Sequence, residues 1–129
     1  MFAVVVCISG IRGVLTKKFL EGKDRQAVLA LGPRHVLAAL RDLEEKRISP
    51  PVVLTDTVEC IQLVHLSPEH GLTPIVFWGD DPEGRASRAT VCLPESADLT
   101  EVARTLDCLA KGVLPRPDNP GSLSRLRRI

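Results

Sequence analysis

Five short runs of apolar, mostly β-branched residues constrain the fold of this 129-residue chain more than any other feature of its sequence. Each run is bounded by Gly, Pro, Ser or Asp, and its hydrophobicity is continuous rather than alternating. This pattern is typical of strands that are buried on both faces of a parallel sheet. The runs are FAVVVCI (2–8), QAVLALG (26–32), PVVLT (51–55), PIVFWG (74–79) and ATVCLP (89–94).

Segments with helical patterns separate most of these runs, at 11–22, 33–47, 59–66 and 96–112. In the last of them, Asp98 stands three residues before Glu101 and predicts a capping box at the helix start. In the first, four apolar residues are expected on the side that faces the core: Val14, Leu15, Phe19 and Leu20. Alternating strands and helices predict an α/β fold, a three-layer open sandwich around a five-stranded parallel sheet.

Composition favours one soluble domain of ordinary character. The chain is 44% hydrophobic and 26% charged, with a net charge of +1, which gives no reason to expect nucleic acid as a partner. The first residues do not follow the pattern of a signal peptide, and no apolar run is long enough for a membrane span, so we expect a cytoplasmic protein without membrane contact.

The composition of the sequence changes near residue 114. We expect a domain over 1–113, followed over 114–129 by a Pro- and Gly-rich tail or linker with a basic end. Three arginines in that end are candidates for partner contact: Arg125, Arg127 and Arg128.

The cysteines and histidines show no metal-binding spacing. Cys7, Cys60, Cys92 and Cys108 are scattered without a C-x-x-C pair, and they are predicted to be buried free thiols. The three histidines, His35, His65 and His70, do not cluster in the sequence either. We therefore expect no metal site and no cofactor.

The stretch GPRHVLAALRDLEEKRISPPVVLTD (32–56) has a Gly before a helix with an Ala- and Leu-rich stripe, and then a buried strand that ends on Asp56. It resembles the receiver domain of bacterial two-component response regulators, and the similarity of pattern extends over about 2–112. The resemblance implies a flavodoxin-like sheet, a role in signal transduction, and the phosphoacceptor position for Asp56.

Several departures from the receiver pattern suggest that the phosphorylation apparatus is lost. The acidic pair that would hold a metal ion at the end of the first strand is replaced by Cys7 and Ile8. Gly79 takes the place of the Thr or Ser after the fourth strand, and Leu93 that of the Lys near the end of the fifth. We therefore expect a non-catalytic pseudo-receiver in which Asp56 caps or hydrogen-bonds the following turn.

The segment DDPEGRASR (80–88) is short, so the helix between the fourth and fifth strands is expected to be reduced or missing. Asp80 and Asp81 in it either form a turn or offer substitute oxygen ligands for a metal ion. In receivers this region carries partner contacts, which implies a protein partner or a homodimer. The candidate contacts here are Trp78, Asp80, Asp81, Leu93 and Glu95.

An alternative starts from VVVCISGIRGVLTKKF (4–19), which is similar to the start of the B component of sugar phosphotransferase systems. That resemblance implies a phosphate-carrying Cys7 in a strand-to-helix loop with Gly10 and Arg12. Cys7 and Arg12 stand one residue too close together for the loop of a low-molecular-weight tyrosine phosphatase.

Overall fold

The computed structural model describes residues 2–22, 25–47, 51–81 and 83–112. The predicted tail, 114–129, with Arg125, Arg127 and Arg128, lies outside these ranges. The five described strands are β1 (Phe2–Cys7), β2 (Arg25–Leu29), β3 (Pro51–Thr55), β4 (Ile75–Trp78) and β5 (Val91–Leu93). The four described helices are α1 (Gly10–Leu20), α2 (Pro33–Glu45), α3 (Val58–Leu66) and α4 (Leu99–Ala110).

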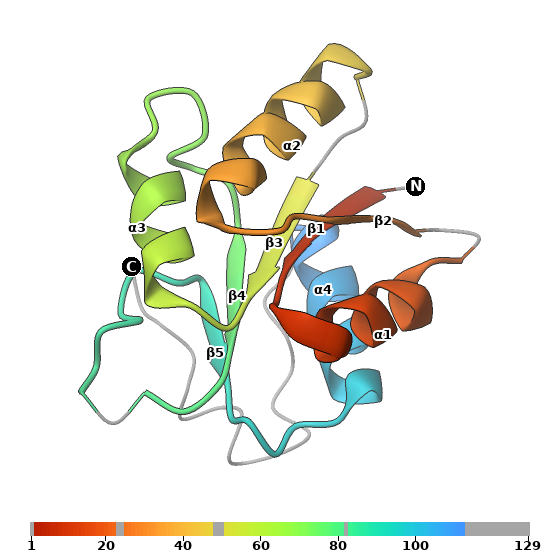
Figure 1. Ribbon diagram of the computed structural model, residues 1–129, viewed down its shortest axis with the longest axis vertical. Coiled ribbons are helices and arrows are strands. Elements are labelled where there is room, and N and C mark those ends of the chain that lie inside the picture. The colour runs from red at the N-terminus through yellow and green to blue at the C-terminus, as the bar shows by residue number, and fades with distance from the viewer. Residues whose placement is uncertain (1, 23–24, 48–50, 82, 113–129) are drawn as a thin grey trace.

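The strands form one parallel sheet in the order β2-β1-β3-β4-β5. Figure 1 shows α1 and α4 on one face of this sheet and α2 and α3 on the other. This is the predicted three-layer α/β sandwich, with the strand order of flavodoxin-like and receiver-like folds. In such sheets the strand order reverses beside β1, and the carboxyl edge there is where ligands usually bind.

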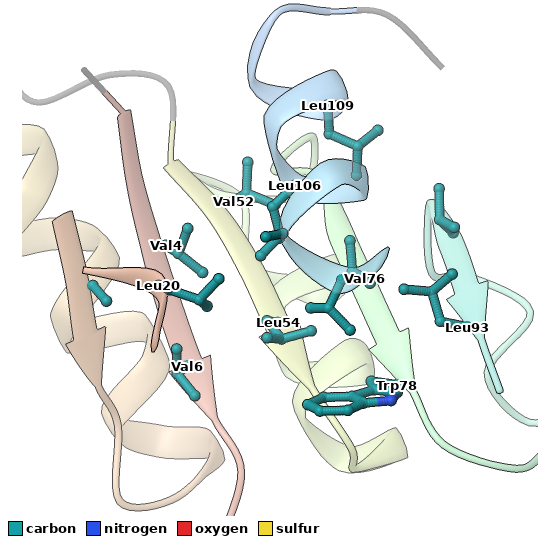
Figure 2. Packing of buried hydrophobic residues seen from close by; sticks show 14 of the residues in the cluster. Val4, Val6, Leu20, Val52, Leu54, Val76, Trp78, Leu93, Leu106 and Leu109 are labelled. Atoms are coloured by element: carbon teal, nitrogen blue, oxygen red, sulfur yellow. The ribbon is translucent and has the colours of Figure 1, made fainter. Parts of the chain in front are cut away.

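Side chains of successive strand residues alternate between two apolar clusters, one on each face of the sheet. Val4, Val52 and Val76 pack under α1 and α4, in the layer shown in Figure 2. Val5, Val53 and Phe77 pack under α2 and α3. Burial of both faces explains why the strands are continuously apolar in sequence.

No helix lies between β4 and β5 in the described part of that connection, which consists of turns. The prediction of a reduced or missing helix there is confirmed. Three small side chains from this region complete the apolar cluster on the α2 and α3 face: Ala86, Ala89 and Cys92. The Asp98 half of the predicted capping box is present, because the Asp98 carboxylate accepts a hydrogen bond of 2.8 Å from the Glu101 amide at the start of α4.

The orientation of α1 differs from the prediction. The helix buries Gly13, Thr16 and Leu20, whereas Leu15 and Phe19 are 55% and 45% exposed. Gly13 explains the difference, because a Cβ built on it would lie 1.9 Å from the Ile8 carbonyl oxygen. Only a glycine allows the helix backbone to approach the end of β1 this closely, so the side with the small residue faces the sheet.

None of the helices in the described ranges is long and apolar enough to cross a membrane.

Candidate functional site

The candidate site lies at the carboxyl edge of the sheet, where β1, β3 and β4 end. Asp56 directly follows β3, and its side chain is partly buried. Cys7 ends β1 and pairs in register with Thr55, while Trp78 ends β4. This edge is where the sequence places the receiver-like site, and it brings together residues from three strands.

Threonines, and not Asp56, organise the turn after β3. The Thr55 hydroxyl donates to the Cys7 carbonyl at 3.1 Å and accepts from the Thr57 amide at 3.1 Å. Thr57 caps α3, because its hydroxyl accepts from the Cys60 amide at 3.3 Å. The predicted capping role of Asp56 is therefore wrong: the cap needs an oxygen at the residue before the first helical turn, and that residue is Thr57.

The carboxyl group of Asp56 is incompletely satisfied. Its Oδ1 is buried and has no hydrogen-bond partner among the described residues. Burial raises the pKa of Asp56, the Arg12 guanidinium opposes this rise, and the Glu95 carboxylate adds to it. A buried polar atom without a partner costs about 1–3 kcal/mol of stability, and such costs are typical of functional sites.

Arg12 lies in the first turn of α1. Its charge acts on Asp56, and its guanidinium lies against the Trp78 ring. Its guanidinium carbon is 4.1 Å from the centroid of the Trp78 ring, which is cation–π geometry. Trp78 itself is only 5% exposed and belongs to the core, as Figure 2 shows at the carboxyl end of β4. The cation whose charge acts on Asp56 is thus a side chain that is already stacked on the Trp78 indole.

Two thiols lie near Asp56 on the face of the sheet that α2 and α3 cover. Cys7 and Cys60 are buried in one cluster although they lie far apart in the sequence. A hydrogen bond from the Cys60 thiol lowers the pKa of Cys7, with a smaller contribution from Thr55, while burial opposes the change. The same hydrogen bond, together with burial, raises the pKa of Cys60. This pair was not predictable from the sequence, because the two cysteines come from different elements.

The residues at this edge do not fit the magnesium site that the receiver resemblance implies. At the end of β1, Cys7 and Ile8 are 4% and 2% exposed, and neither is a ligand for a hard cation. Asp81 is occupied elsewhere, since its two carboxylate oxygens accept from the amides of Arg85 and Ala86, each at 2.8 Å. Within the described ranges, no three potential ligand atoms gather around Asp56.

The predicted partner contacts in the described ranges differ in burial, and Asp81 is half-buried with its carboxylate bonded within the turn. Asp80 and Glu95 are exposed and available to a partner. Trp78 and Leu93 are in the core, with Leu93 1% exposed, so this prediction is corrected for both side chains. Both belong to the apolar cluster on the α1 and α4 face of the sheet, in which Figure 2 labels them.

Comparison with known proteins gives no relative: no family model, curated protein or solved structure matches the chain.

Proposed function

We propose that this chain is a receiver-like regulatory module that acts by binding a protein partner and is not phosphorylated at Asp56 in the ordinary way. The observation that carries the proposal is the surroundings of Asp56: an arginine and two thiols lie near it, and no three potential ligand atoms of the described residues gather around it.

Phosphoryl transfer to an aspartate needs an ionised carboxylate and a hard cation that neutralises the incoming phosphate. Burial raises the pKa of Asp56, which disfavours the ionised nucleophile. Arg12 supplies one positive charge, but its guanidinium is held over the Trp78 ring. A guanidinium donates hydrogen bonds but does not coordinate carboxylate and phosphate oxygens as a metal ion does, so this edge supports recognition better than phosphoryl transfer.

The exposed side of α1 supports a role in protein binding. Four apolar side chains lie along it in helical spacing, with exposed fractions from 39% to 77%: Ile11, Val14, Leu15 and Phe19. We name this surface the α1 stripe. Contiguous exposed apolar side chains of this kind are typical of protein–protein contact sites. The α1 stripe begins one residue from Arg12, so a protein bound there would contact the helix that carries the cation of the Asp56 site.

The test for the phosphorylation part is incubation with a small acyl phosphate and Mg²⁺, followed by measurement of the intact mass. We expect no phosphoryl adduct, while an active receiver domain treated in parallel becomes modified. Asp81→Asn serves as the matched control for Asp56→Asn, because both remove one carboxylate near the same edge. An adduct that persists in Asp81→Asn and disappears in Asp56→Asn would refute the proposal.

The lowered pKa of Cys7 favours a second candidate, a phosphate carrier that uses this thiolate. Its burial argues for a structural thiol, since a phosphodonor must reach the sulfur. The alkylation rate at neutral pH separates the two roles when wild type is compared with Cys7→Ser. A rate above that of a free cysteine, lost in Cys7→Ser and retained in Cys108→Ser, supports the carrier.

A further inference from the structure

Three potential metal ligands gather at the amino edge of the sheet, at the opposite end of β3 from Asp56. Glu44 lies in the last turn of α2, while Glu69 and His70 lie in the connection between α3 and β4. One ligand atom from each of these side chains lies within 4.8 Å of the other two. In Figure 1 the end of α2 and the connection from α3 to β4 lie at the same end of the molecule, above the sheet.

His70 is the feature that distinguishes this cluster from an ordinary group of surface acids. Its side chain is only 8% exposed, and its Nε2 is buried without a hydrogen-bond partner among the described residues. The Glu69 Oε2 lies 3.7 Å from that nitrogen, which is too long for a hydrogen bond. A buried ring nitrogen without a partner, 3.7 Å from a carboxylate oxygen, is a place where a bound metal ion would satisfy both groups.

A cavity of about 240 Å³ gives the cluster both space and an opening to solvent. Glu44, Glu69 and His70 all line it, together with Arg47 and the first residue of β3, Pro51. Two backbone hydrogen bonds fix the loop around His70. The His70 amide donates to the Ser67 carbonyl at 3.3 Å, and the His70 carbonyl accepts from the Thr73 amide at 3.0 Å. His70 is therefore held in place by its own loop before any ligand binds.

Neighbouring cations neutralise only part of the negative charge of Glu44 and Glu69. Arg41 reaches Glu69 Oε2 at 3.9 Å, but both side chains are more than half exposed, so this ion pair is weak. Glu44 forms no ion pair with any residue in the described ranges, although Arg47 lines the same cavity. One carboxylate and the imidazole thus remain available for a ligand of positive charge.

We propose that Glu44, Glu69 and His70 bind a divalent first-row transition-metal ion, for which zinc is the probe. Imidazole nitrogen favours this class over Mg²⁺ and Ca²⁺, and carboxylate oxygens complete a set that zinc accepts. Three protein ligands leave at least one coordination position for water from the cavity. The bound ion joins the end of α2 to the loop before β4. This metal site does not depend on the proposed function of the Asp56 edge.

The test is a titration of the reduced full chain with ZnCl₂ by isothermal calorimetry, with thermal unfolding as a second readout. We expect one ion per chain and a higher unfolding midpoint in zinc, because the ion binds the folded state. Glu44→Gln and His70→Gln each weaken binding at least about tenfold, a loss that even removal of an outer-shell partner can cause. Glu45→Gln, an exposed neighbour on α2 that does not line the cavity, binds zinc as wild type does.

Cys108 is the least buried thiol of the chain and is the main competing ligand. Cys108→Ser is expected to bind zinc with unchanged affinity. Because Glu44 is exposed, Glu44→Gln retains the fold, and its circular dichroism spectrum verifies this. Zinc binding that is unaffected by Glu44→Gln, or that is lost in Cys108→Ser, overturns the proposal, as does the absence of binding to wild type.

Discussion

The guanidinium of Arg12 stacks 4.1 Å from the ring centroid of Trp78, and so α1 is joined to the end of β4 across the candidate site. Cation–π pairs of this kind contribute about 0.5–1 kcal/mol at partly exposed sites. We expect Arg12→Met to lower the free energy of unfolding by about that amount. Since Trp78 is the single tryptophan of the chain, its fluorescence reports the change directly.

The control for Arg12→Met is Lys18→Met, which removes an exposed cation from the same helix. Urea denaturation followed by fluorescence should give a lower midpoint for Arg12→Met alone, and the emission spectrum should change only in that variant. Equal effects of both substitutions would mean that the stacking contributes nothing specific.

The pKa of Asp56 makes stability depend on pH in a defined direction. Because burial raises its pKa in the folded state, the folded chain retains a proton that the unfolded chain releases near its ordinary pKa of about 3.9. The contribution of this group to stability is complete below that pH and is lost as pH rises through the folded-state pKa. Asp56→Asn removes the dependence, so the variant should gain stability relative to wild type between pH 4 and pH 7, roughly the range above the ordinary pKa.

Urea denaturation of wild type and Asp56→Asn across this range measures the difference. A variant that instead loses stability relative to wild type as pH rises would show that the charge of Arg12, and not burial, governs Asp56.

Gly13 provides a test of how closely α1 approaches the sheet. Replacing a glycine with alanine inside a helix normally stabilises it by about 1 kcal/mol. Here the new Cβ would meet the Ile8 carbonyl oxygen at 1.9 Å, and the backbone would have to shift. We expect Gly13→Ala to destabilise the protein by about 1–3 kcal/mol, as overpacked substitutions do.

Gly22→Ala is the matched control, because nothing lies within 4 Å of a Cβ built at that position. Its unfolding free energy should stay within about 0.5 kcal/mol of wild type. A neutral or stabilising Gly13→Ala would contradict the packing of α1 described above.

The α1 stripe should contribute to association and not to stability. Leu15 is 55% exposed, so Leu15→Glu is expected to change the free energy of unfolding by no more than about 0.5 kcal/mol. Any concentration-dependent self-association of wild type in sedimentation velocity should decrease in this variant. The control is Leu72→Glu, which alters a fully exposed leucine far from α1 in sequence (99% exposed) and should leave association unchanged.

The fold was predictable because the patterns that indicate it involve residues that are close together in the sequence. The apolar runs and the Asp98 cap each depend on residues that are adjacent in sequence, and the structure confirms both. The orientation of α1 was not predictable in the same way. Its apolar residues form a regular stripe, but the approach of Gly13 to Ile8 is a contact between two elements that outweighs the pattern.

The sites were less predictable because their members come from distant elements. Asp56 could be placed at the end of a strand from the sequence alone. The contact between Cys7 and Cys60, the stacking of Arg12 on Trp78, and the approach of Glu44 to His70 each require the three-dimensional arrangement. No spacing pattern along the chain predicts these contacts.

The edge strand β5 has only three residues, all of them buried, and the described part of the connection before it contains no helix. A short edge strand exposes few free amide and carbonyl groups, so it offers a poor template for the strand of another chain. The brevity of β5 therefore protects this edge of the sheet against edge-to-edge aggregation.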